Sequence, residues 1–152
     1  MDLGKIPPND IEAEQAVLGS MLVDKDAVFE AMEVLKEDDF YREDHKSIYS
    51  AISTLCSRGE PIDIITVKSE LELQGKLEKI GGVEYLVDLP EKVPTIANIQ
   101  KYVKIVEEKS ILRNLIKASN EITTMGYEQT EEVETIMEQA EKKIFDLMQK
   151  KN

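Results

Sequence analysis

A long stretch without helix breakers sets the strongest limit on how this chain can fold. From Thr95 to Met125 the sequence contains neither glycine nor proline, which predicts a helix of 31 residues. At 1.5 Å per residue such a helix is roughly 46 Å long. Its apolar face consists of residues spaced mainly three and four positions apart, among them Ile96, Ile99, Val103, Val106, Leu112, Leu115, Ile116 and Ile122.

A second amphipathic segment follows this stretch. We expect Gly126 to end the long helix, Thr130 to cap the next one, and residues 131–149 to form it. Two long helices joined by about four residues fold back into a helical hairpin. Such a hairpin cannot bury both apolar stripes by itself. It must pack on the rest of the chain, on another chain, or on both.

The part of the chain before Thr95 predicts a compact bundle of short helices. Apolar spacing places them over residues 10–22, after Asp24, up to Arg58-Gly59, over 67–74 and over 83–89. We expect Asn9 to cap the first helix and Thr66 to cap the fourth, which leaves residues 62–65 as the only extended stretch. The predicted fold class is therefore all-α, with a globular helical subdomain over residues 1–94, a helical hairpin over 95–149 and the start of a linker over 150–152.

The charge balance excludes several classes of function. The chain has 19 Lys and Arg against 31 Asp and Glu, a formal net charge of -12. Neutralising DNA phosphates needs clustered Lys and Arg, so we expect little or no direct DNA binding. No apolar run approaches the ~20 residues of a membrane span. The single cysteine, Cys56, excludes an internal disulfide, and we expect a cytoplasmic protein with no membrane partner.

Motifs for catalysis and cofactor binding are absent from the sequence. There is no GxxxxGK[ST] phosphate-binding loop, and His45 is the only histidine, which excludes a His-rich metal site. Cys56 follows His45 by eleven residues, roughly 16 Å along one predicted helix, too far for proton transfer. We interpret Cys56 as a core residue and His45 as a helix-start or packing residue. The chain itself is therefore predicted to hold no catalytic residue, metal or cofactor.

Three residues near the predicted bundle remain open to two interpretations. Glu12 and Glu14 lie near a helix start, where they can stabilise the helix dipole and also remain exposed to a partner. Tyr85 follows the Gly81-Gly82 turn and is either a core residue or an aromatic anchor for a partner. From the residues alone, the chain is predicted to be an interaction or assembly module.

Eight short motifs occur in order along residues 6–148 and together carry a family resemblance. They are Pro7-Pro8 with Ile11–Gly19, Asp39-Phe40-Tyr41 with His45 and Ile48, Gly59–Asp63, Ile80-Gly81-Gly82 with Tyr85-Leu86, Ala97-Asn98-Ile99 with Tyr102, Ile105–Lys109, Leu112-Arg113, and Ala140-Glu141 with Ile144-Phe145. In this order they resemble the N-terminal domain of the bacterial replicative DNA helicases of the DnaB family.

The resemblance implies an assembly role without a reaction on this domain. In the family, six copies form a collar of three dimers, largely through hairpin contacts, and the collar recruits primase. The family's RecA-like ATPase domain, which binds ATP and Mg, has no counterpart before Asn152. Carried over by position, the partner-sensitive sites fall on Glu12, Tyr85, Ile116 and Ile122. A helicase loader is a further partner that the resemblance allows.

Ile116 and Ile122 should not act in the same way. They lie six residues apart, about 240° around a helix at 100° per residue, so they cannot share one narrow line of contact. At least one of them is expected to shape the hairpin or the dimer instead of touching primase.

Two alternatives from other classes stay open at this point. A stand-alone acidic helical adaptor, acting as a loader or a regulator, would share the fold without a helicase motor. A carboxylate-metal hydrolase would need its activity or melting temperature to respond to added metal. The reading frame beyond Asn152 separates the helicase from the adaptor.

Overall fold

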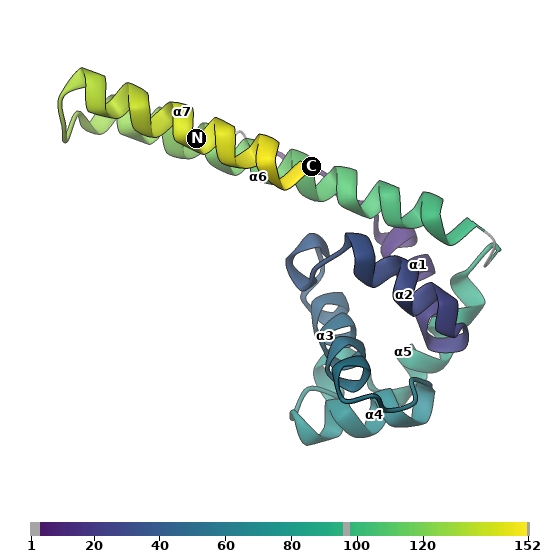
Figure 1. The fold of residues 1–152 in the computed structure, drawn as a ribbon. Coiled ribbons are helices and arrows are strands. Elements are labelled where there is room, and N and C mark those ends of the chain that lie inside the picture. Colours follow the sequence, from purple (N-terminus) through teal and green to yellow (C-terminus); the bar gives the residue numbers. More distant parts are fainter. Residues whose placement is uncertain (1–3, 96–97, 152) are drawn as a thin grey trace. The chain divides into compact units, whose positions relative to one another are not determined.

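The computed structural model describes residues 4–95 and 98–151, and every regular element in them is helical (Figure 1). The α-helices are α1 (Ile11–Val23), α2 (Lys25–Val34), α3 (Glu43–Ser57), α4 (Ile64–Leu73), α5 (Gly82–Asp88), α6 (Ile99–Glu128) and α7 (Val133–Lys151). Short 3-10 turns are η1 (Glu37–Asp39), η2 (Glu78–Ile80) and η3 (Leu89–Lys92). The predicted all-α class is confirmed.

The chain divides into two compact units, which we call the core unit (Asn9–Glu108) and the hairpin unit (Met1–Pro8 with Lys109–Asn152). Their boundary lies inside α6, whereas the sequence pattern divides the chain at residues 94 and 95. The physical reason is that Ile99, Val103 and Val106 are buried in the apolar cluster of the core unit. Residues 150 and 151 belong to α7 and not to a linker, and Ile96, Ala97 and Asn152 lie outside the described residues.

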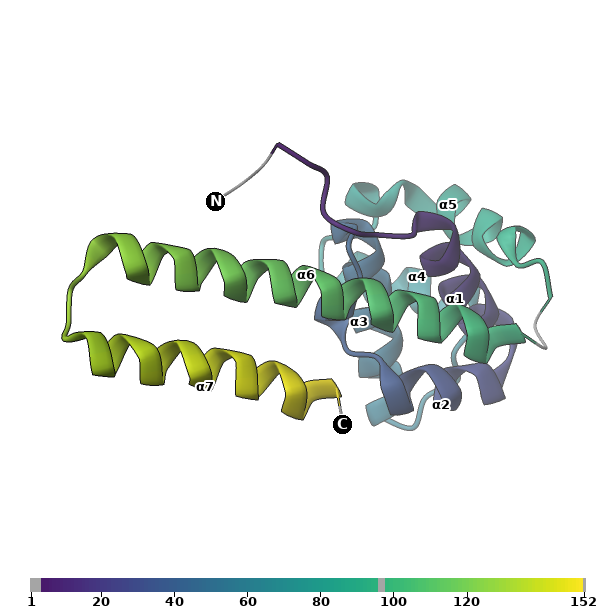
Figure 2. The same cartoon turned by 90° about the horizontal axis from the view of Figure 1, so that it is seen from above.

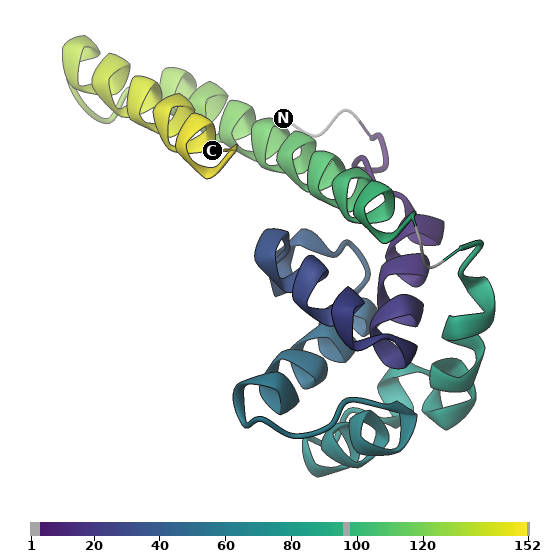
Figure 3. The same cartoon turned by 45° about the vertical axis from the view of Figure 1, so that its right-hand side comes forward.

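The core unit packs short helices around one apolar cluster (Figure 3). Helix α1 contacts both α2 and η3, and α3 contacts α4. Gly19 lets α1 lie directly against η3, because a Cβ atom there would lie 2.3 Å from the carbonyl oxygen of Leu89. The fully buried side chains include Val17, Leu18, Phe40, Ile48, Ile52, Leu71, Leu86 and Leu89.

Two predicted helix starts in the core unit are wrong, in both cases because an aspartate provides the cap. Asp10, not Asn9, caps α1, and its Oδ1 accepts from the amide of Ala13 at 2.9 Å. Asp63 caps α4 by accepting from the amide of Thr66 at 2.8 Å, while the Thr66 hydroxyl accepts from the Asp63 amide at 2.9 Å. Residues 64 and 65, predicted as extended, are thus the first turn of a helix.

In the hairpin unit, α7 and the later part of α6 run side by side in opposite directions (Figure 2). Lys143 of α7 forms an ion pair with Glu121 of α6 at 2.6 Å. Helix α6 continues through Gly126 to Glu128, and Gln129 takes the positive φ of 51° that ends it. The expected stop at Gly126 is therefore wrong, and α7 starts at Val133, not at residue 131.

Large apolar side chains of the hairpin unit remain exposed. Of its described hydrophobic residues, Ala118 alone is buried. In a two-helix hairpin each helix covers only one side of the other, so the remaining sides stay exposed. The exposed ones are Ile6, Leu112, Leu115, Ile116, Tyr127, Val133, Met137, Ile144, Phe145 and Met148. This observation matches the sequence argument that a hairpin cannot cover both of its stripes.

Candidate functional site

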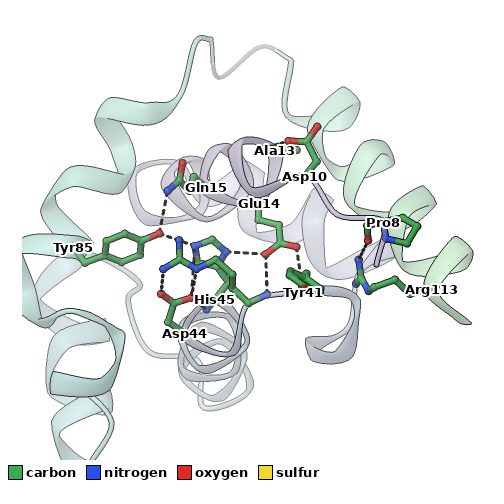
Figure 4. Close-up of polar contacts among 11 residues, drawn as sticks. Pro8, Asp10, Ala13, Glu14, Gln15, Tyr41, Asp44, His45, Tyr85 and Arg113 are labelled. Carbon is green, nitrogen blue, oxygen red and sulfur yellow. Dashed lines mark hydrogen bonds and ion pairs between the residues drawn. The ribbon is translucent and has the colours of Figure 1, made fainter. Parts of the chain in front are cut away.

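A buried chain of polar side chains runs through the core unit and ends at Tyr85 (Figure 4). Glu14 of α1 lies 2.8 Å from Nδ1 of His45, the third residue of α3. On the other side of the imidazole ring, Nε2 of His45 lies 2.7 Å from the hydroxyl of Tyr85 on α5. Glu14 is 1% exposed and His45 is 0% exposed, so bulk solvent reaches neither side chain. We call these three residues the Glu14–His45–Tyr85 chain.

The hydrogen-bond partners are all satisfied when Glu14 is ionised and the imidazole of His45 is neutral. An ionised Glu14 only accepts, so Nδ1 of His45 carries a proton and donates to it. In the neutral imidazole Nε2 then accepts, and the Tyr85 hydroxyl donates to it. The same hydroxyl oxygen accepts from Nε2 of Gln15 at 3.1 Å. Every polar atom of the Glu14–His45–Tyr85 chain thereby has a partner.

Glu14 also binds the backbone that leads into α3. Arg42, the residue before α3, makes no side-chain cap of its own. Instead the Glu14 carboxylate accepts from the backbone amide of Tyr41 at 2.7 Å and, more weakly, from that of Arg42 at 3.5 Å. A negative charge at this position is favoured by the dipole of α3. Glu14 therefore joins α1 to the start of α3.

Arg42 covers the ring of Tyr85 near the surface. Its guanidinium carbon lies 5.6 Å from the ring centroid, a cation–π arrangement, and it forms a bidentate ion pair with Asp44. Burial lowers the pKa of Arg42, but its hydrogen bond to Asp44 and the nearby negative groups outweigh burial and raise it. The positive charge of the Arg42 guanidinium therefore lies permanently beside the ring of Tyr85.

The four residues predicted as partner sites fall into two separate places. In the core unit Glu12 is exposed, Tyr85 is half-buried, and Gln15 connects them. Gln15 lines the same cleft of about 340 Å³ as Glu12 and donates to the Tyr85 hydroxyl. These two sites therefore belong to one neighbourhood of the core unit.

The other two sites belong to the hairpin unit. Ile116 is 45% exposed and lines an open, mainly apolar cleft of about 1240 Å³ together with Ile6, Leu115 and Met125. The N-terminal segment stays beside this part of α6, because Nη1 of Arg113 donates to the carbonyl oxygen of Pro8 at 2.8 Å (Figure 4). Ile122 is half-buried and does not line the cleft. The two isoleucines thus have different surroundings.

Sequence reasoning misses the buried position of Glu14, the contact of Arg42 and the role of His45. The expectation that Glu14 remains exposed is wrong, because its carboxylate is turned into the core. The sequence does contain one signal for this. Glu14 precedes Val17, Leu18 and Met21 by three, four and seven residues, so it lies on the apolar face of α1. Arg42 carries no such signal.

Metal-binding and membrane-spanning features are not found in the described residues. Among residues 4–95 and 98–151, no group of three or more His, Cys, Asp or Glu side chains is arranged to hold a metal ion. None of the helices in the described part of the chain has the length and apolar content to cross a membrane. Cys56 is half-buried and carries a free thiol.

Comparisons with known proteins give a consistent result. Residues 6–108 match the family described as DnaB-like helicase N terminal domain. The chain is 51% identical over 148 residues to replicative DNA helicase DnaC of Bacillus subtilis, covering 97% of this chain and 33% of that protein. It is 45% identical over 148 residues to replicative DNA helicase DnaB of Geobacillus stearothermophilus, with the same coverage of 97% and 33%. The chain thus spans about a third of the length of these curated relatives.

Solved structures share the fold. The crystal structure of the N-terminal domain of DnaB helicase from Mycobacterium tuberculosis matches with a TM-score of 0.88 and 43% identity, covering 93% of this chain and 99% of that one. A DnaB-like replicative helicase, solved in a study of its interactions with primase, matches with a TM-score of 0.75 and 23% identity. It covers 91% of this chain and 31% of that one, and at this identity it supports the fold alone.

Proposed function

Because the chain belongs to the DnaB-like helicase N-terminal domain family, we propose that it works as the non-catalytic collar domain of a replicative DNA helicase. The observation that carries the proposal is the 51% identity to a replicative helicase over 97% of this chain. ATP and Mg²⁺ would then be bound by a motor domain outside these residues. This chain would bind neither of them and little or no DNA.

We propose primase as the partner that docks on the core unit. Support comes from the exposed carboxylate of Glu12 and from Tyr85, whose half-buried ring lies beside Arg42. An aromatic ring paired with an arginine is typical of the few residues that dominate a protein interface. One solved relative is described together with its interactions with primase, which makes primase the first partner to test.

Replacing Tyr85 with alanine is expected to weaken primase binding by about 1–3 kcal/mol, because it removes the proposed anchor. Isothermal titration calorimetry with the C-terminal, helicase-binding part of primase measures this change. Val87→Ala is a matched control, since Val87 is 47% exposed on the same helix. Unchanged affinity in the Tyr85 variant, with wild type binding well, would move the docking surface elsewhere.

The hairpin unit is proposed to bind a second copy of the chain. Its exposed apolar residues and its cleft of about 1240 Å³ are a surface that monomeric proteins rarely leave uncovered. A two-fold interface would bring the same surface of both copies together. Dimers of this kind would support assembly of a hexameric parent helicase.

Ile116→Asp is expected to shift the proposed dimer towards the monomer, since burying an unpaired charge in an interface is unfavourable. Ile122→Asp should weaken self-association as well, by changing the shape of the hairpin instead of a contact in the cleft. Sedimentation velocity over a range of concentrations measures both effects. Ile65→Asp is the control, because Ile65 is 74% exposed but lies on α4 of the core unit. A wild-type chain that is monomeric at high concentration would contradict the proposal.

The collar domain and the stand-alone adaptor predict different reading frames after Asn152. If this chain is a collar domain, its reading frame continues into a GxxxxGK[ST] motif. A frame that ends near Asn152 would favour a stand-alone adaptor. A helicase loader stays a further proposed partner, for which the described residues single out no surface.

A further inference from the structure

We propose that His45, held by Glu14, is a positioning residue that fixes Tyr85 in the orientation required for docking; this inference rests on the proposed function. The observation behind it is the Glu14–His45–Tyr85 chain, in which two buried residues from α1 and α3 meet a half-buried residue from α5. The three hydrogen bonds of the His45 ring and the Tyr85 hydroxyl all join residues that are distant in sequence. Glu14 lies 31 residues from His45, and Tyr85 lies 40 residues from His45 and 70 from Gln15.

The first step is that the surroundings of Tyr85 hold it from two sides. His45 and Tyr85 have nearly parallel rings, with 16° between their planes and 5.9 Å between their centroids. The hydroxyl joins Nε2 of His45 at 2.7 Å, and the guanidinium of Arg42 lies over the ring. A half-buried tyrosine without these contacts could change rotamer. With them, its ring is fixed before a partner arrives.

The second step concerns His45 itself. An imidazole can hold Tyr85 only if its own ring is fixed, and the Glu14 carboxylate fixes it through Nδ1. The same carboxylate is held by the amide of Tyr41 at the start of α3. Orientation is therefore passed from the backbone of α3 through Glu14 and His45 to Tyr85. This arrangement is analogous to the outer partners that orient a histidine in a functional site.

The third step is that the Tyr85 hydroxyl is already bound by two side chains of the core unit. Its oxygen lies 2.7 Å from Nε2 of His45 and accepts from Nε2 of Gln15 at 3.1 Å. A docking protein would therefore contact the ring and Arg42, while the hydroxyl serves only to hold the ring. Ordering a free side chain costs about 0.5–1.5 kcal/mol on binding, so a ring that is already ordered binds about 2- to 10-fold more tightly.

Two substitutions at His45 separate positioning from general stability. His45→Asn retains an amide nitrogen near Nδ1, which can bond Glu14, but loses the atom that faces Tyr85. His45→Gln places its amide near Nε2, which can bond Tyr85, but loses the partner of Glu14. If His45 acts through Tyr85, His45→Asn lowers primase affinity about 2- to 10-fold, whereas His45→Gln, which keeps the bond to Tyr85 but not the one to Glu14, loses clearly less. Equal losses in both variants would overturn the proposal.

A double-mutant cycle adds the decisive comparison. Tyr85→Phe should lose as much affinity as His45→Asn, because it removes only the hydroxyl that holds the ring. Adding His45→Asn to Tyr85→Ala should cost no further affinity, since the ring to be positioned is gone. A further loss in that background would show that His45 affects binding by another route, and the proposal would be wrong.

A measurement without primase keeps this inference distinct from the proposed function. In NMR spectra of the whole chain, Tyr85 should show a single ring orientation in wild type and His45→Gln, and rotamer averaging in His45→Asn. If wild type does not bind primase, the proposed function fails while the NMR result still tests the positioning. If Tyr85 remains equally ordered in all three proteins, positioning by His45 is refuted even where primase binds.

Discussion

Replacing Glu14 with alanine is expected to lower the free energy of unfolding of the core unit by about 1–3 kcal/mol, the cost of leaving a buried polar group without its hydrogen-bond partner. The substitution removes the acceptor of Nδ1 of His45, which is fully buried, and one acceptor of the partly buried amide of Tyr41. It also removes the negative charge that lies beside the N-terminus of α3. Urea unfolding followed by circular dichroism measures the change.

The neighbouring acid provides the control. Glu12 lies two residues earlier on α1 and is exposed, so Glu12→Ala should change the stability by no more than about 0.5 kcal/mol. Both variants lose one negative charge from the same first turn of α1. If the two substitutions cost the same, the Glu14 carboxylate is not the buried hydrogen-bond acceptor described above.

This pair of acids separates what local sequence determines from what packing determines. The sequence predicts both near a helix start, and both lie there. Their difference depends on residues 27 to 31 positions away, at Tyr41 and His45, which only the packing of α1 against α3 brings near. The face of the helix carries a hint, because Glu14 shares it with Val17. The spacing of apolar residues does not identify His45 as the hydrogen-bond partner that allows the Glu14 carboxylate to be buried.

Helix ends divide in the same way between local and distant causes. The helices themselves follow from apolar spacing, which predicts most of them close to their observed positions. Their caps depend on which of several adjacent polar residues takes the extended backbone, as Asp10 does instead of Asn9. The boundary of the core unit inside α6 has a distant cause, the burial of Val103 and Val106. The apolar repeat of α6 does not show at which residue the helix stops packing in the core unit and becomes part of the hairpin unit.

Replacing a glycine with alanine is a second substitution with a large expected effect on stability, and the effect depends on where the glycine lies. Gly19→Ala is expected to destabilise the core unit by about 3 kcal/mol, the upper part of the range for overpacking. The added Cβ would lie 2.3 Å from the oxygen and 2.8 Å from the carbon of the Leu89 carbonyl. These are backbone atoms of η3 and cannot turn aside as a side chain can. Thermal and urea unfolding measure the loss.

The same substitution at Gly126 should act in the opposite direction. Gly126 is inside α6, and an added Cβ there would meet no atom within 4 Å, so alanine gains helix propensity of up to about 1 kcal/mol without a clash. Hydrogen exchange of the last turns of α6 measures this gain locally. Alanine has the same intrinsic advantage at Gly19, so the difference between the two variants isolates the cost of the contact between α1 and η3. Stabilisation by Gly19→Ala would mean that α1 and η3 can separate freely, and the close approach would then not explain why glycine is needed there.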